Sequence, residues 1–259
     1  MLKHWDERRD IAMPGDTDKT IAFAVDHWLS LAKKAIEQTN RFVVALSGGS
    51  TPQTIFQKLA EKEGALDWSR VWLFWSDERS VPADHPDNNY HMAMQSGLAH
   101  LPIPKNQIFR MKAETDIEKN ALAYEKNIQK ILSEDLFDLV MLGLGEDGHT
   151  ASLFPKTKAL EETDRLVVAN EVKQKKTWRM TFTYSCINQS KCAVIYALGA
   201  AKKTIVKEVL ESPLPSPFPA SFIGTATHKA LWILDDLASQ EVFPKIDLFS
   251  PRKKSKKKR

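Results

Sequence analysis

The sequence of 259 residues has few of the features that mark membrane, secreted or disulfide-rich proteins. It contains two cysteines, Cys186 and Cys192, without CxxC spacing, so a disulfide framework is excluded and both are expected to be buried thiols. No stretch reaches the roughly 18 uninterrupted apolar residues of a membrane helix. The first ten residues, MLKHWDERRD, are too charged for a signal peptide. We therefore expect a cytoplasmic protein that makes no contact with a membrane.

Acidic residues are absent from the last ten positions, which hold seven Lys or Arg. Without those seven, 30 bases face 33 acids, so residues 1–249 carry a formal charge of −3 although the whole chain carries +4. The basic character belongs to the tail, which argues against a nucleic-acid-binding surface on the body. We expect a single folded domain over 1–249 and a solvated, disordered tail over 250–259, because a run of like charges cannot bury itself.

Short apolar runs alternate with amphipathic segments along the chain, which is typical of βαβ units. The predicted fold is therefore α/β, an open, mostly parallel, doubly wound sheet flanked by helices, with room for a small α+β subdomain. Apolar runs predict strands at 42–46, 71–75, 108–111, 137–142, 166–169, 178–183, 192–198 and 231–234. Helical spacing predicts helices around 21–29, 55–59, 117–131 and 200–211. The proline-rich run at 212–219 ends the last helix.

The segment LSGGSTP, residues 46–52, joins a predicted strand to a predicted helix. Its glycines, Gly48 and Gly49, permit close backbone approach, and Ser50 or Thr51 can cap the helix. Together with Ser47, this turn offers free N–H groups and the positive end of a helix dipole to a phosphate. A capped turn without a ligand explains the same small residues equally well.

The segment WSDERSVPADHPDNNY, residues 75–90, follows the next predicted strand. Ligands of open α/β sheets lie beyond the carboxyl ends of the strands, so Asp77, Glu78 and Arg79 fall where a site would be built. A surface loop with internal salt bridges is the alternative. The DNNY run is interpreted as the capped start of a helix.

The segment GLGEDGHTASLFP, residues 143–155, carries the GxGxxG spacing of dinucleotide-binding loops. It lies in mid-chain, its proline allows only a short helix, and no acid follows at the usual interval, so we reject that interpretation. Asp147 and His149 remain on one glycine-flanked turn at a strand end. Histidine is the natural general base near neutral pH, and a nearby carboxylate can fix its tautomer. The other histidines lack metal-ligand spacing, so no metal site is predicted.

Two basic residues, Arg179 and Lys202, complete the candidate set. Arginine suits bidentate phosphate recognition and lysine a point-charge contact. Arg179 interrupts an otherwise apolar strand, where a buried charge must find a partner. Lys202 follows Gly199 at the start of a helix and, taken alone, is better explained as a surface residue.

Taken in order, LSGGSTP, SDERSVP with DNNY, GLGEDGHTASLFP, WRMTFT, the turn at 199–202 and PAS at 219–221 resemble the 6-phosphogluconolactonases. These enzymes hydrolyse 6-phospho-D-glucono-1,5-lactone in the oxidative pentose phosphate pathway and need no cofactor. They belong to a wider group with glucosamine-6-phosphate deaminase and ribose-5-phosphate isomerase. The resemblance covers about 20–240, and its most specific element is DGHTASLFP, which the deaminases do not share in full.

The resemblance implies an open α/β sheet with the site at the carboxyl ends of its strands. It places the catalytic histidine on His149, its aspartate on Asp147 and a catalytic arginine on Arg79. Sugar-phosphate contacts fall on the loop from Ser47 to Thr51, which includes Gly48, Gly49 and Ser50, and on Arg179 and Lys202.

Rival functions remain open on the sequence alone. An amino-sugar-phosphate deaminase or isomerase would use the same phosphate loop and histidine, and a regulator without catalysis would keep the sugar-phosphate site. Seven clustered charges in the tail would give unspecific, salt-dependent attachment to nucleic acid. The expected partner is a small sugar-phosphate lactone, and the expected assembly is a monomer or a weak homo-oligomer.

Overall fold

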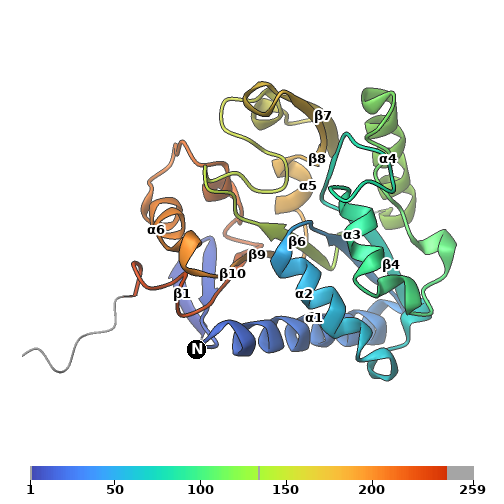
Figure 1. The fold of residues 1–259 in the computed structure, drawn as a ribbon, viewed down its shortest axis with the longest axis horizontal. Helices are drawn as coiled ribbons and strands as arrows, with labels where there is room; N and C mark the ends of the chain where they lie inside the picture. Colours follow the sequence, from blue (N-terminus) through green and yellow to red (C-terminus); the bar gives the residue numbers. More distant parts are fainter. Residues whose placement is uncertain (1, 134, 244–259) are drawn as a thin grey trace, which may run out of the picture.

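The computed structural model describes residues 2–133 and 135–243, and its centre is a seven-stranded sheet in the order β1-β2-β10-β9-β6-β3-β4 (Figure 1). Every neighbouring pair is parallel except β1 and β2. The predicted α/β fold with a mostly parallel sheet is confirmed. The strands are β1 (Leu2–Asp6), β2 (Arg9–Ala12), β3 (Phe42–Leu46), β4 (Val71–Trp75), β6 (Leu139–Gly143), β9 (Ala193–Ala197) and β10 (Ala230–Leu234).

A second, smaller sheet has three antiparallel strands in the order β5-β8-β7. They are β5 (Asp77–Arg79), β8 (Thr177–Phe182) and β7 (Val167–Val172). The apolar runs predicted at 166–169 and 178–183 therefore pair with each other here and not in the parallel sheet. This small sheet lies beside the large one, where it forms one wall of the site described below.

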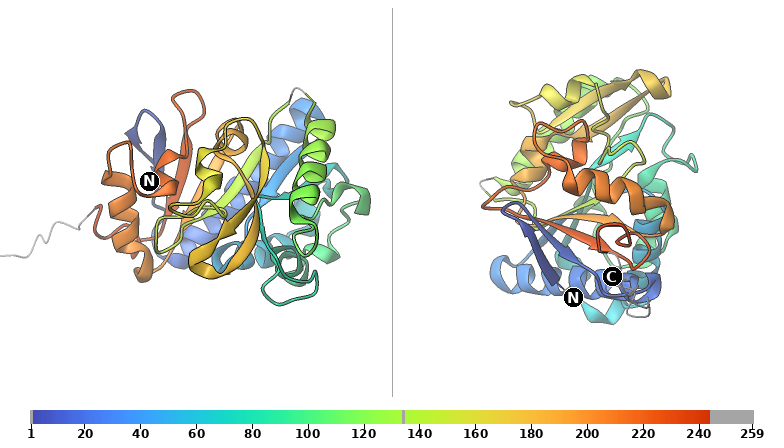
Figure 2. Two further views of the ribbon diagram at one scale, coloured as in Figure 1. Left: turned by 90° about the horizontal axis from the view of Figure 1, so that it is seen from above. Right: turned by 90° about the vertical axis from the view of Figure 1, so that its left-hand side faces the viewer.

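Helices cover both faces of the large sheet (Figures 1 and 2). Along one face run α1 (Thr17–Thr39) and α2 (Ser50–Ala60), while α4 (Ile117–Leu132), α5 (Tyr184–Asn188) and α6 (Lys203–Glu211) lie on the other side, and α3 (Asn89–Gln95) packs beside α2. All residues of β3 and β9 are buried, as expected for strands covered twice. Short 3-10 helices are η1 (Glu63–Ala65), η2 (Trp68–Arg70), η3 (Leu98–His100), η4 (Lys105–Gln107), η5 (Lys158–Glu161), η6 (Lys173–Lys175), η7 (Ala200–Lys202) and η8 (Pro219–Phe222).

Two parts of the strand prediction are wrong. The run at 108–111 forms no strand, and only Ile108 makes an isolated parallel bridge, to Leu73. The hairpin of β1 and β2 was not predicted, because its sequence is strongly charged. One of those charges, Arg9, is only 4% exposed and bonds to Asp6 at 2.6 Å and to the carbonyl of Leu210 at 3.0 Å. A buried charge is tolerated when it is paired in this way.

Ser76 joins the two sheets at one point. Its N–H and hydroxyl donate to the carbonyl of Leu46, at 2.8 and 3.1 Å, and the hydroxyl also lies 3.2 Å from the carbonyl of Met141. Its own carbonyl accepts from the N–H of Phe182, at the end of β8, at 2.8 Å. This buried residue therefore fixes the small sheet to β3 and β6.

Other sequence expectations have simple outcomes. No helix in the described part of the chain is both long and apolar enough to cross a membrane. Both cysteines are free; Cys186 is buried and Cys192 is partly buried, because it lies just before β9. The expected basic tail, 250–259, lies outside the described residues.

Candidate active site

A cavity of about 420 Å³ lies at the carboxyl ends of β3, β4, β6 and β9, which are neighbours in the large sheet, with β5 and β8 of the small sheet beside them. Nine of the ten predicted site residues line this cavity: Ser47, Gly48, Gly49, Ser50, Thr51, Arg79, His149, Arg179 and Lys202. The tenth, Asp147, is not among its lining residues and contacts His149 instead. Residues that are widely separated in the chain are thus gathered at the sheet edge where open α/β folds bind ligands.

The loop after β3 presents the start of α2 to the cavity. The helix is preceded by Gly49, whose φ of 103° is readily adopted only by glycine, and no side chain caps it. The prediction that Ser50 or Thr51 caps this helix is therefore wrong. Both lie inside its first turn, so their backbone N–H groups lack a side-chain acceptor and are available to an anion.

The loop after β6 carries a histidine held by a carboxylate. His149 Nδ1 lies 2.5 Å from Asp147 Oδ1, and the ring stacks on Phe154 with centroids 4.0 Å apart. Gly145 makes room for this arrangement, since a Cβ there would collide with the imidazole. Burial raises the pKa of Asp147, but the hydrogen bonds and electrostatic attraction of His149 outweigh burial and leave the pKa below its usual value. The pair therefore favours an ionised Asp147, which accepts a hydrogen bond from Nδ1–H of His149 and leaves Nε2 as the acceptor.

Two arginines stand side by side on the small sheet. Arg79 on β5 is the register partner of Arg179 on β8, and both line the cavity. Within residues 2–133 and 135–243, neither forms a salt bridge. Arg79 donates to the carbonyl of Asp87 at 2.8 Å, and Arg179 donates to the hydroxyl of Thr177 at 3.3 Å. Burial lowers the pKa of Arg179, the carboxylate of Asp77 opposes that effect, and Arg79 lowers it further. Two adjacent guanidinium groups that form no salt bridge with any described residue favour binding of a multiply charged anion.

Two lysines add positive charge to the cavity beside these arginines. Lys202 donates to the carbonyl of Leu144 at 2.8 Å, which holds its ammonium group at the glycine-rich loop and does not leave it at the surface. Lys175 in η6 also lines the cavity and was not predicted. Its only sequence signal is the lysine-rich run at 173–176, which is more simply interpreted as a solvated loop. In the part of the chain that the structure describes, no cluster of His, Cys, Asp or Glu could hold a metal ion.

Asp77 and Glu78 are buried beside the arginines. The sequence predicted that both lie near a site but assigned neither of them a role. Asp77 accepts a 2.6 Å hydrogen bond from Ser152 and also binds the amide of Asn89. Glu78 is fully buried and accepts from the backbone N–H groups of Arg79, Asn89 and Tyr90 at 2.7 to 2.9 Å. Burial raises the pKa of Glu78 to about 7, against the opposing effect of those three donors. These carboxylates fix the loop that carries Arg79 and the start of α3.

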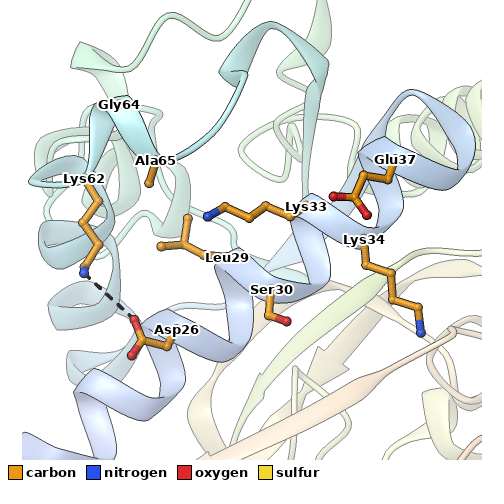
Figure 3. Close-up of a pocket in the computed structure, with 9 residues that line it drawn as sticks. All are labelled: Asp26, Leu29, Ser30, Lys33, Lys34, Glu37, Lys62, Gly64 and Ala65. Atoms are coloured by element: carbon orange, nitrogen blue, oxygen red, sulfur yellow. Dashed lines mark ion pairs between the residues drawn. The ribbon is translucent and has the colours of Figure 1, made fainter.

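A larger hollow of about 790 Å³ lies elsewhere, between α1 and η1 (Figure 3). Charges of both signs line it, and Asp26 pairs with Lys62 at 3.9 Å across one end. Its side chains are mostly exposed, and it contains none of the predicted residues. We therefore place the candidate site in the smaller cavity, where buried groups and strand ends converge.

Comparisons with known proteins place this chain among sugar-phosphate enzymes. A family model described as glucosamine-6-phosphate isomerases/6-phosphogluconolactonase matches residues 15–232. A 6-phosphogluconolactonase of Chlamydia muridarum is 43% identical over 86% of this chain and 89% of its own length, and one of Synechocystis is 39% identical over 82% and 89%. The crystal structure of 6-phosphogluconolactonase from Thermotoga maritima matches with a TM-score of 0.76 and 29% identity, covering 88% of this chain and all of that one. The chain therefore belongs to the family of glucosamine-6-phosphate isomerases and 6-phosphogluconolactonases.

Proposed function

We propose that this protein hydrolyses 6-phospho-D-glucono-1,5-lactone to 6-phospho-D-gluconate in the oxidative pentose phosphate pathway. The relatives from two Chlamydia species, 43% and 41% identical, carry the name of that activity. The observation that carries the proposal is the combination, in one cavity, of a histidine paired with an aspartate and two guanidinium groups that form no salt bridge within the described part of the chain. The lactone ring needs a base that activates water, and the remote phosphate needs positive charge that binds it.

His149 acts as the general base in this proposal. Asp147 holds Nδ1, so Nε2 can accept a proton from a water molecule as that water attacks the lactone carbonyl carbon. Collapse of the tetrahedral intermediate breaks the bond to the ring oxygen, which takes the proton back from the imidazolium. Positioned proton transfer of this kind contributes on the order of 10²- to 10⁴-fold to the rate.

The anionic groups of the substrate and of the intermediate bind to the basic residues and free N–H groups of the cavity. The phosphate binds at the start of α2, from Ser47 to Thr51, with Arg179 and with Lys175 or Lys202. Backbone N–H groups of the glycine-rich turns, helped by Arg79, stabilise the oxyanion that forms at the carbonyl. Phosphate binding then serves to orient the distant reacting carbon.

The domain organisation follows from the same cavity. Both sheets supply lining residues, and Ser76 joins them, so we propose that 1–249 is one functional domain. The basic run at 250–259 has no part in the proposed chemistry.

A direct assay of lactone opening tests the proposal. The lactone is generated enzymatically and its disappearance is followed above the spontaneous rate for wild type, His149→Ala and His100→Ala. His100 is exposed and outside the cavity, so its loss should leave kcat unchanged, whereas His149→Ala should lower it. Wild type that does not exceed the spontaneous rate, or ammonia release from glucosamine 6-phosphate in its place, would refute the assignment.

A further inference from the structure

The segment PAS, residues 219–221, is one of the sequence motifs that carry the resemblance, but the proposed mechanism gives it no role. It forms most of η8, and neither this segment nor the preceding Phe218 lines the cavity. The segment nevertheless contacts the loop that carries His149. The N–H of Ala220 donates to the carbonyl of Gly148 at 2.9 Å.

Gly148 lies between the two residues of the proposed catalytic pair, Asp147 and His149. Its φ of 74° is in the left-handed region that favours glycine. A Cβ added there would lie 2.6 to 3.0 Å from Cδ1, Cβ and Cγ of Phe218, so the Phe218 side chain packs directly on this backbone. One backbone hydrogen bond and one side-chain contact therefore hold the residue that joins the pair.

The segment that makes these contacts is itself anchored on three sides. Ser221 is completely buried, and its hydroxyl donates to the carbonyl of Val209 on α6 at 3.1 Å. The carbonyl of Ser221 accepts from the guanidinium of Arg8 at 2.9 Å. The hydroxyl of Tyr184 on α5 donates to the carbonyl of Pro219 at 3.1 Å. The loop of the catalytic pair is thus connected to α5, to α6 and to the turn between β1 and β2.

The hydrogen bond between Asp147 and His149 depends on the backbone of a short turn. Glycine has more conformational freedom to lose on folding than any other residue, so a turn centred on Gly148 needs contacts from outside to keep one conformation. We infer that Phe218 is a positioning residue, which acts through Gly148 to keep Nδ1 of the imidazole hydrogen-bonded to Asp147. The effect of this role on the reaction rests on the proposed function, because it requires His149 to be the base.

Substitutions of Phe218 test this role in the lactone assay. Phe218→Ala removes the contact and should lower kcat roughly 10- to 100-fold, since a displacement of about 1 Å can cost on the order of 100-fold. KM should stay nearly unchanged, because the phosphate contacts lie on other loops. Phe218→Leu keeps Cβ, Cγ and Cδ1, the three atoms nearest to the added Cβ, and should therefore retain most of the wild-type kcat.

Nuclear magnetic resonance of the imidazole nitrogens gives a readout that does not depend on activity. In ¹⁵N-labelled protein at about pH 9, well above the ordinary histidine pKa of about 6.5, correlations from the ring protons show which nitrogen carries the proton. His149→Gln identifies the signals of His149 by their loss. Wild type and Phe218→Leu should show the tautomer with the proton on Nδ1, whereas Phe218→Ala should show a mixture of both tautomers.

Phe222, at the other end of η8, provides a matched control. It is half-buried like Phe218, and its ring packs against Tyr184 with the centroids 5.5 Å apart. Phe222→Ala removes an equal aromatic group and should lower the melting temperature, but it should leave the tautomer of His149 and kcat at their wild-type values. If Phe218→Ala does not fold, Phe218→Val, which lacks Cδ1, takes its place in both measurements.

The role of Phe218 and the proposed function can fail separately. Wild type that does not hydrolyse the lactone refutes the proposed function, and the tautomer measurement still decides the role of Phe218. A single tautomer with the proton on Nδ1 in Phe218→Ala would overturn that role, and so would an equal mixture of tautomers in Phe222→Ala. An unchanged kcat in Phe218→Ala, with the lactone hydrolysed by wild type, would overturn it as well.

Discussion

Burial of Glu78 predicts that this protein loses stability as the pH rises toward neutrality. The pKa of Glu78 lies at about 7 in the folded chain against an ordinary value of 4.5, mainly because burial disfavours the carboxylate. Between those values the folded state binds more protons at this residue than the unfolded state does. The free energy of unfolding therefore falls as pH rises through this window, and the contribution is fully retained only below pH 4.5.

The magnitude follows from the two pKa values. At about 1.4 kcal/mol per pKa unit, the loss amounts to about 3 kcal/mol over the whole window and to about 2 kcal/mol between about pH 5 and pH 7.5. The residue is fully buried, so solvent screening does not reduce this figure. Glu78→Gln removes the titration, and its loss of acceptors for the N–H groups of α3 adds an offset that does not change with pH.

Urea unfolding at about pH 5 and about pH 7.5 measures this change in the free energy of unfolding. The stability of wild type minus that of Glu78→Gln should fall by about 2 kcal/mol from the lower to the higher pH. Glu114→Gln is the control: Glu114 bonds to Arg110, which lowers its pKa, so its contribution is lost only as the pH falls through the acidic range and stays nearly constant here. Parallel profiles for wild type and Glu78→Gln would contradict the reasoning.

Further predictions concern the cavity. His149→Ala should lower kcat on the order of 10²- to 10⁴-fold with little change in KM, and steady-state kinetics that show an equal rise in KM would contradict its role as base. Arg179→Ala should raise KM roughly 10- to 100-fold, because a hydrogen bond to a charged group is lost, and added phosphate should inhibit this variant less than wild type. Gly145→Ala should lower kcat and the melting temperature together, since its Cβ would displace the imidazole, and a variant with normal activity would argue against the observed loop. Asp147→Asn should lower kcat more than KM, because an amide can present its N–H to Nδ1 and so favour the wrong tautomer, as the pH profile of kcat would reveal.

The sequence predicted those parts of the site that depend on local chain signals. Glycines beside His149 and after the strand at 42–46 marked two loops at strand ends, and both line the cavity. Strands with an apolar pattern were found at nearly their observed bounds, since burial on both faces leaves a clear signal. The DNNY helix start was also found, and Asn88 caps it through its side chain.

The remaining features depend on contacts between distant residues. The strand from Asp77 to Arg79 is polar and short, and its pairing with β8 joins residues about a hundred positions apart, so nothing local marks it. Arg9 was part of a charged run whose partners include a carbonyl on α6. Asn89 was interpreted as a cap like its neighbour, because only the fold brings its amide to Asp77. The local pattern cannot distinguish two adjacent asparagines with different roles.

The attachment of both sheets at Ser76 keeps the start of α2 and the arginines at a fixed separation. Because its hydrogen bonds tie the end of β3 to the end of β8, the arginines cannot shift toward or away from the start of α2 without breaking buried bonds. Under the proposed function, the phosphate contacts from the start of α2 and from Arg179 are then in place before the substrate arrives. Phosphate binding requires no movement of one sheet against the other.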